Sequence, residues 1–288
     1  LHKEYRRQRQ MCIRDSMHKV RVIPVLLLKK WGIEKSIRFR DNVYIGSPIN
    51  AVRVFNGRNV DELILLDIIA TPERRGPDLE VIRQITSEAQ MPLTVGGGIR
   101  DLDTIRGLMG AGVDRVAINT AAVEAPQFIH EAASVFGSQC IVVSLDAKQT
   151  ARGYEVYTHG GTRATGIDII DHARRMEDLG AGELLLTSID RDGTMSGYDL
   201  DLVRSVADAV SIPVIACGGA GKVADLGAAV REGHATAVAA GAFFLFYGPR
   251  RTVLITYPDD AALINELGED RVRLKDAQRL PPIRPAHS

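Results

Sequence analysis

An aspartate at the end of an apolar run is the first candidate for chemistry in this sequence. The segment IVVSLDAK, residues 141–148, places Asp146 two residues before Lys148. A carboxylate at such a position can act as a general acid or base, especially where partial burial raises its pKa. The alternative is a structural ion pair with Lys148, which is the weaker interpretation at a strand end.

A second segment has the same shape but lacks the carboxylate. IPVLLLK, residues 23–29, also runs from apolar residues into a lysine, and Leu27 stands two residues before Lys29. Leucine neither donates nor accepts a proton, and loss of one positioned acid or base typically costs about 10²- to 10⁴-fold in rate. The comparison of the two segments therefore raises the question of whether the chain lacks half of a catalytic pair.

Two glycine-rich segments could bind phosphate. VGGGIR at 95–100 and ACGGAG at 216–221 are each followed, one apolar run later, by small or polar residues, INT and AAG. Glycines let backbone N–H groups approach a phosphate closely. The alternative is that glycine only permits a tight turn. Because the two segments occur at the same spacing within a repeat, we favour a ligand with a phosphate at each end.

The roles of the other polar residues near apolar runs stay open. Asp67 and Asp190 could each take part in chemistry or cap a turn. For His159, in YTHGGTR, we expect a turn-forming or hydrogen-bonding role. No ligand set has suitable spacing for a metal, so we predict none. Four other histidines are predicted to lie on the surface: His18, His130, His172 and His234.

The elements that must position these residues follow from the apolar pattern. Runs that are apolar at nearly every position are separated by stretches with apolar residues three and four apart, which predicts a parallel sheet covered by helices. Eight such units in about 250 residues predict an α/β fold, the (β/α)8 TIM barrel. The strand runs are VRVIPVLL, ELILLDI, PLTVGG, RVAIN, CIVVSLD, ELLLTSI, IPVIACGG and ATAVAAG.

An internal repeat supports this barrel. Glu62 and Glu183, Pro92 and Pro213, and Gly97 and Gly218 are offset by the same 121 residues. The repeat predicts two half-barrels related by a pseudo-twofold axis. A doubly wound open sheet is the second interpretation, although it explains the repeat less directly.

The barrel also predicts what lies at its two faces. The segment 28–47, with Lys29, Lys30 and Lys35, is long enough to form a mobile lid over the mouth. At the opposite face, four charged residues begin strands and can meet in a ring: Arg21, Glu62, Arg115 and Glu183. The default interpretation of this ring is a plug, and the alternative is a gate on an axial path.

Composition excludes several classes of partner. Lys plus Arg and Asp plus Glu both total 36, so there is no net basic field for nucleic acid or an anionic membrane. No apolar run approaches the roughly 20 residues of a membrane span. Cys12, Cys140 and Cys217 have neither metal-ligand nor disulfide-framework spacing, which favours a reducing cytoplasm.

We expect three regions along the chain. Residues 1–16 are charged and lack the apolar centre of a signal peptide, so they are interpreted as a disordered or spurious extension. The barrel is predicted to occupy residues 17–267. Residues 268–288 are rich in proline and basic residues towards their end and are expected to form a flexible tail.

Five segments together closely resemble the cyclase subunit of imidazole glycerol phosphate synthase. They are VGGGIRDLDTIRGLMGAGVDRVAINTAAV, FGSQCIVVSLDAK, YEVYTHGGTRATGIDIIDHA, LGAGELLLTSIDRDGTMSGYDL and SIPVIACGGAG. The resemblance covers residues 17–250, and related phosphate-binding barrels share the glycines but not these blocks together. It implies a barrel that receives ammonia from a glutaminase subunit on its N-terminal face and conducts it to a bisphosphate substrate, without a cofactor.

The resemblance also implies roles for individual residues. One phosphate site would comprise Gly97, Gly98, Asn119 and Thr120. The other would comprise Asp192, Gly193, Gly219, Ala240 and Gly241, where Gly241 replaces the usual serine. Lys35 corresponds to a lid lysine. The ring of Arg21, Glu62, Arg115 and Glu183 corresponds to an ammonia gate, with Arg115 in place of a lysine.

Departures from the family pattern modify the expected function. The family uses two aspartates at the ends of the first and fifth strands; Asp146 matches the second, and Leu27 replaces the first. The loop KKWGIEK and the segment LFYGPRRTVLITYP also differ. These changes resemble a paralogous branch found beside a glutaminase and a sugar amidotransferase, where ammonia serves acetamidino-sugar synthesis for surface polysaccharides. We therefore expect an ammonia conduit with an impaired acid–base pair.

Three alternatives are weighed against this expectation. The chain could be a genuine cyclase, a C–N lyase of histidine biosynthesis, with Asp67 or a lid residue replacing the lost aspartate. It could be a non-catalytic scaffold that activates the glutaminase. The isomerase sister barrel of the pathway is the third, and the IDRDGT and YTHGG blocks argue against it.

Overall fold

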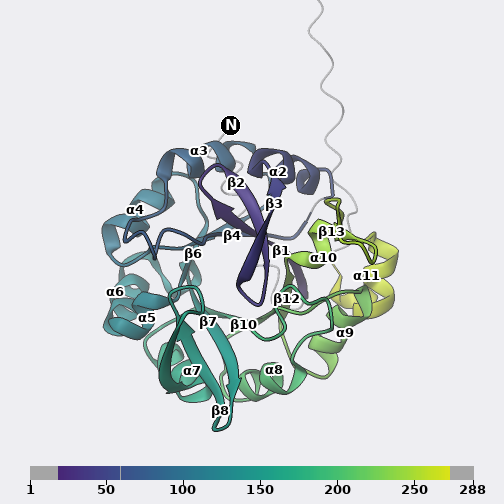
Figure 1. Cartoon of the computed structure of the whole chain (residues 1–288). Helices are drawn as coiled ribbons and strands as arrows, with labels where there is room; N and C mark the ends of the chain where they lie inside the picture. Colours follow the sequence, from purple (N-terminus) through teal and green to yellow (C-terminus); the bar gives the residue numbers. More distant parts are fainter. Residues whose placement is uncertain (1–18, 59, 273–288) are drawn as a thin grey trace, which may run out of the picture.

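Parallel strands form a closed barrel in this computed structural model, which describes residues 19–58 and 60–272 (Figure 1). Each strand pairs with the next, and β12 pairs with β1 to close the sheet. The TIM barrel prediction is confirmed, and the doubly wound open sheet is wrong. The barrel strands are β1 (Arg21–Lys29), β4 (Leu63–Asp67), β5 (Leu93–Gly96), β6 (Arg115–Ile118), β7 (Ile141–Thr150), β10 (Glu183–Ser188), β11 (Val214–Cys217) and β12 (Ala237–Ala240).

Helices surround this barrel (Figure 1). Aspartates begin several of them: the carboxylates of Asp78, Asp101, Asp168 and Asp199 accept backbone N–H groups in the first turns of α3, α4, α7 and α8. The helices are α2 (Pro48–Asn56), α3 (Leu79–Glu88), α4 (Leu102–Gly110), α5 (Thr120–Glu124), α6 (Gln127–Phe136), α7 (Ile169–Asp178), α8 (Leu200–Ala207), α9 (Val223–Arg231), α10 (Ala242–Leu245) and α11 (Asp260–Leu267).

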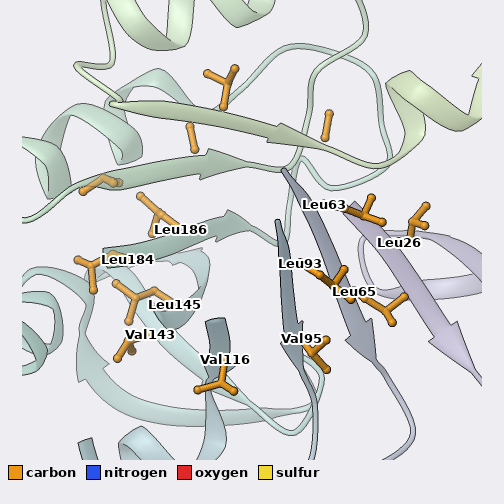
Figure 2. Packing of buried hydrophobic residues seen from close by; sticks show 14 of the residues in the cluster. Leu26, Leu63, Leu65, Leu93, Val95, Val116, Val143, Leu145, Leu184 and Leu186 are labelled. Carbon is orange, nitrogen blue, oxygen red and sulfur yellow. The ribbon is translucent and has the colours of Figure 1, made fainter. Parts of the chain in front are cut away.

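Side chains alternate between two apolar layers along each strand. On β4, Leu63 and Leu65 belong to the outer core packed under the helices (Figure 2), whereas Ile64 belongs to a separate cluster along the barrel axis. The inner cluster includes small side chains such as Ala117 and Ala239. The alternation follows from the two-residue period of a strand, so inward residues at strand ends face the two mouths.

Antiparallel hairpins interrupt the strand–helix alternation at positions that the sequence did not reveal. The hairpin of β2 (Gly32–Ile37) and β3 (Arg40–Gly46) extends β1, and the hairpin of β8 (Gly153–Thr158) and β9 (Arg163–Asp168) extends β7. A third, short hairpin is formed by β13 (Phe246–Tyr247) and β14 (Thr252–Val253). The first strand of each half-barrel therefore carries a hairpin, consistent with the repeat.

The segment predicted as a lid corresponds to the first of these hairpins. In Figure 1, β2 and β3 extend over the barrel centre. The tip is attached to the loop after β10, because Arg38 donates its backbone N–H to Asp192 O at 2.8 Å and its Nε–H to Asp190 O at 3.0 Å. The segment thus covers part of the mouth as ordered β-structure, and its mobility stays a prediction. The expectations for residues 1–16 and for residues beyond 272 lie outside the described residues.

The prediction of a surface position for His172 is wrong. His172 lies on the inner face of α7 and is 3% exposed, with Ile169, Ala173 and Met176 on the same buried face. Their spacing of three, four and seven residues was a readable signal for a buried position. Burial, followed by the nearby charge of Arg175, lowers the pKa of His172 to about 4. His130 and His234 are exposed, as predicted.

Burial of neutral His172 predicts an acid-sensitive fold. The unfolded chain binds a proton at an imidazole pKa near 6.5, whereas the folded chain resists protonation until about pH 4. The free energy of unfolding should therefore fall by up to about 3 kcal/mol from this residue as the pH drops from 6.5 to 4. In His172→Leu, urea unfolding across this range should show a correspondingly shallower decline. An unchanged slope in the variant would contradict the assignment.

Candidate functional site

A cavity of about 530 Å³ opens at the carboxyl ends of the barrel strands. This is the end at which barrels of this type hold their active sites. Its floor and walls combine an apolar side, with Leu27 and Leu66, and a polar side, with Ser144, Asp146 and Thr187. The strand ends thus bring together residues that are far apart in sequence.

Among the carboxylates that line this cavity, that of Asp146 has no hydrogen bond or ion pair to the residues that the structure describes. It points inward from β7, between the outward-facing Leu145 and Ala147, and is 9% exposed. Burial, followed by the negative charge of Asp192, raises the pKa of Asp146 to about 7. Lys148 instead lies over the Tyr157 ring, with Nζ 5.6 Å from the centroid. The ion-pair interpretation for Asp146 and Lys148 is therefore wrong.

Leu27 occupies the corresponding position in the other half-barrel. It pairs with Leu66 of β4, as Asp146 pairs with Thr187 of β10, and four strand positions separate β1 from β7 around the closed sheet. Leu27 and Leu66 pack on the inner apolar cluster. The two halves thus present an apolar patch on one side of the mouth and a titratable carboxylate on the other.

Asp67 is bound in a way that removes it as a replacement for the missing aspartate. Its carboxylate pairs with Arg75, 2.8 Å from Nη1, and accepts the backbone N–H groups of Ile69 and Ala70 at 3.1 Å. These contacts hold the loop after β4. Asp190 likewise accepts the backbone N–H of Gln149 at 3.0 Å, so both aspartates act as structural groups here.

The first glycine site, hereafter the first cradle (Gly97, Gly98, Asn119 and Thr120), lines the cavity as a whole. Glycine is required at 97 and 98 by close packing, because a Cβ would lie 2.2 Å from Asp67 O and 2.3 Å from Arg75 O. The amide of Asn119 donates to Ser144 O at 3.0 Å, which connects the cradle to β7. Sequence reasoning missed Arg74 and Arg100, which also line the cavity.

The second glycine site, hereafter the second cradle (Asp192, Gly193, Gly219, Ala240 and Gly241), is arranged differently. Asp192 and Gly241 line the cavity, whereas the other three residues lie outside its lining. Lys35 extends from β2 and forms a buried ion pair with Asp192, with 2.7 Å between Nζ and Oδ2. The two halves of the barrel are therefore not equivalent at the mouth.

His159 forms the turn between β8 and β9 at the cavity rim. Its φ of 54° is left-handed, and its backbone N–H donates to Thr120 Oγ1 at 3.2 Å. Its Nδ1 lies 3.2 Å from Thr158 Oγ1. These contacts agree with the predicted turn-forming and hydrogen-bonding role.

At the opposite end of the barrel, four charged side chains form a closed ring. Arg21 pairs with Glu62 at 2.7 Å and also with Glu183, and Arg115 pairs with the same two glutamates. Thr94 Oγ1 donates to Glu62 Oε1 at 2.7 Å and holds that carboxylate in place. Each charge thus contacts two opposite charges across the axis.

Burial sets the electrostatics of this ring. Burial disfavours the charged form of Glu62, but Arg115 and Arg21 outweigh it and hold the pKa of that carboxyl below its usual range. Burial likewise opposes protonation of Arg21, while Glu183 and Glu62 raise its pKa. The Nε of Arg115 is buried and has no hydrogen-bond partner in the described parts of the chain. The ring is charged and closed, with one group left unsatisfied.

Comparison with known protein families covers the part of the chain that forms this barrel. The model of the histidine biosynthesis protein family matches residues 21–248. The chain belongs to the histidine biosynthesis protein family. Its matched region includes the cavity, both cradles and the ring.

Within this family barrel, the cavity can perform limited proton chemistry. A carboxyl with a pKa of about 7 can both donate and accept a proton near neutral pH. Leu27 on the apolar side cannot supply a second group. No helix among residues 19–58 and 60–272 combines the length and apolar character needed to cross a bilayer.

The raised pKa of Asp146 predicts that its ionised form destabilises the folded chain. Above pH 7 the ionised carboxylate is buried, whereas at pH 4 the group is protonated in the folded chain and partly protonated in the unfolded chain. Asp146→Asn should therefore raise the free energy of unfolding by about 1–3 kcal/mol at pH 8, with most of the gain lost by pH 4. Urea unfolding at both pH values measures it.

Asp67→Asn is the matched control. It removes a carboxylate that is paired with Arg75, so it should destabilise the fold at pH 8. Destabilisation by Asp146→Asn at pH 8 would contradict the raised pKa.

Proposed function

We propose that this barrel accepts ammonia from a glutaminase subunit docked on its N-terminal face and delivers it at the mouth for glycosyl amidation in surface polysaccharide synthesis. The observation that carries the proposal is the contrast between the two ends: the four-charge ring is complete, whereas Leu27 stands where Asp146 would need a second carboxylate. In this proposal the ring is the gate for ammonia, and the mouth lacks half of an acid–base pair.

The interior between the ring and the cavity favours neutral ammonia. The axial cluster consists of apolar side chains, including Ile23, Ile64, Ala117, Leu185 and Ala239. Moving an ammonium ion through such surroundings carries a large desolvation cost, whereas neutral ammonia lacks the full charge. The ring must therefore open without admitting protons and bulk water, and each of its charges has two partners through which it can stay paired during opening.

The proposed acceptor system consists of a phosphorylated small-molecule ligand at the mouth and a sugar amidotransferase that uses the released ammonia. The first cradle and its arginines support an anionic ligand. The apolar patch of Leu27 and Leu66 supports a role in which ammonia leaves the mouth rather than entering a two-carboxylate reaction.

A second candidate is a genuine cyclase of histidine biosynthesis. Asp146 supports it, because a carboxyl with a pKa of about 7 is well matched to acid–base catalysis at neutral pH. This candidate requires one carboxyl to serve both proton-transfer roles, since Asp67 is held by Arg75.

The ring gives the direct test of ammonia delivery. Arg115→Ala removes the partner of Glu62 and Glu183 on one side and should destabilise the fold by about 3–5 kcal/mol, because it leaves buried charge unpaired. In the reconstituted complex, glutamine hydrolysis should continue while ammonia incorporated into product falls severalfold. Added ammonium should restore product formation. Glutamate and product are measured together.

Arg115→Lys is the matched control, since it keeps a cation at the same strand position. It should retain coupling between glutamine hydrolysis and product. Unchanged one-to-one coupling in Arg115→Ala would leave the ring as a structural plug. Glutaminase stimulation without ammonia delivery would favour the scaffold alternative.

Complementation separates the two candidate functions. We expect the chain to leave a strain without the histidine-pathway cyclase dependent on histidine, and Leu27→Asp alone to restore little activity, because two positioned groups act as a unit. Growth of the strain carrying the unaltered chain would refute the amidation proposal in favour of the cyclase. Asp146→Asn should abolish such growth, since it removes the proton-transfer group.

A further inference from the structure

We propose that the cavity takes a ligand with a single anionic end, bound at the first cradle, because the β2–β3 hairpin closes the second cradle. This inference rests on the proposed binding of a phosphorylated ligand at the mouth. It differs from the two-phosphate ligand expected from the sequence repeat. The ligand class is a small monophosphate with an apolar or weakly polar body.

The hairpin contacts the second cradle through backbone and side chain. A Cβ on Gly193 would lie 2.1 Å from Ser36 O, so the two backbones touch directly. Arg38 donates its backbone N–H to Asp192 O at 2.8 Å. Lys35 places its ammonium on the Asp192 carboxylate, with 2.7 Å between Nζ and Oδ2, so this cation is already paired within the protein. The cradle is thus occupied by the protein's own groups.

Two departures from the family pattern meet at this place. A Cβ on Gly241 would lie 3.0 Å from Cε and 3.1 Å from Cδ of Lys35, so glycine makes room for the lysine side chain. Arg251, from the divergent segment near β14, donates to Gly193 O at 2.7 Å and lies over the Phe246 ring. The absence of a side chain at position 241 therefore allows Lys35 of the hairpin to reach the second cradle.

The charges lining the cavity are distributed unequally. Lys35 neutralises Asp192, and Arg75 is paired with Asp67. Arg74 and Arg100 line the cavity beside the first cradle without an ion pair to any described residue. Guanidinium groups suit phosphate recognition, so the anionic end of a ligand belongs on this side.

The remainder of the cavity defines the body of the ligand. Leu27 and Leu66 give the cavity an apolar wall, and Asp146 offers a carboxyl to a hydroxyl or amine. The volume of about 530 Å³ lies within the range of small-molecule sites and has room for a monosaccharide phosphate. The geometry therefore points to one phosphate and one hydrogen-bonding group.

Titration of the full chain tests the inference. Calorimetry with inorganic phosphate at low salt should give one site per chain. Competition should then place fructose 6-phosphate and fructose 1,6-bisphosphate within about threefold of each other, since the second phosphate gains no charged contact. Arg100→Gln should weaken phosphate binding by about fivefold or more. Arg83→Gln, on the outer surface of α3, is the matched control and should change nothing.

Two variants of the hairpin contact test whether opening the second cradle creates a second phosphate site. Gly241→Ser should displace Lys35, and the double variant Lys35→Met with Asp192→Asn should remove the ion pair without leaving one buried charge alone. We expect at least one of them to gain a second phosphate site and to prefer the bisphosphate by about tenfold, as a charge-assisted contact would allow.

The outcomes separate this inference from the proposed function. Two phosphates bound by the unaltered chain, or a tenfold preference for the bisphosphate, would overturn the single-ended ligand while ammonia delivery stood. Absence of a second site in both hairpin variants would overturn closure by the hairpin. Loss of ammonia delivery with one phosphate still bound would refute the proposed function alone.

Discussion

Pairing of β12 with β1 closes the sheet, and this closure determines where every charged group in the barrel can lie. Once the strands form a cylinder, their side chains alternate between the helix layer and the axis. The apolar axis leaves only the two ends for inward-facing charge. Arg21 and Glu183 lie at one end, and Asp146 lies at the other.

The two ends handle buried charge in different ways. At the floor, two arginines and two glutamates neutralise one another, and Thr94 supplies a further hydrogen bond. Removing any member of such a ring should lower the free energy of unfolding strongly, because the remaining charge would be buried without a partner. At the mouth, no cation is paired with Asp146 among the described residues, and burial raises the pKa of this carboxyl. The floor therefore holds paired charges, whereas the mouth holds a carboxyl whose pKa is raised by burial.

The pseudo-twofold repeat places equivalent backbones at the mouth, and side chains then make the halves unequal. Both first strands carry hairpins, but β1 presents Leu27 to the cavity and β7 presents Asp146. Both glycine turns have left-handed backbones at the offset positions Gly97 and Gly218. Only the second half is covered by Lys35 and Arg251. A symmetric scaffold thus holds an asymmetric site.

The sequence by itself determined the barrel, its repeat and the location of Asp146. Runs of buried strands and amphipathic helices have short periods, so local composition is enough to predict them. The resemblance to the family, rather than the repeat offset, predicted that Leu27 stands opposite Asp146. His172 follows a helical period that indicates burial, whereas the polarity of histidine favours a surface position, and the structure shows it buried.

Only the tertiary structure decided how the site is divided. The hairpin after β1 pairs strands through backbone groups, and its contact with Gly193 joins residues from different halves of the chain. The Lys35 and Asp192 pair, the binding of Asp67 by Arg75, and the arginines beside the first cradle likewise depend on distances across loops. Local patterns describe which way a residue faces within its own element. They do not contain the separation between two loops, which depends on the packing of the whole barrel.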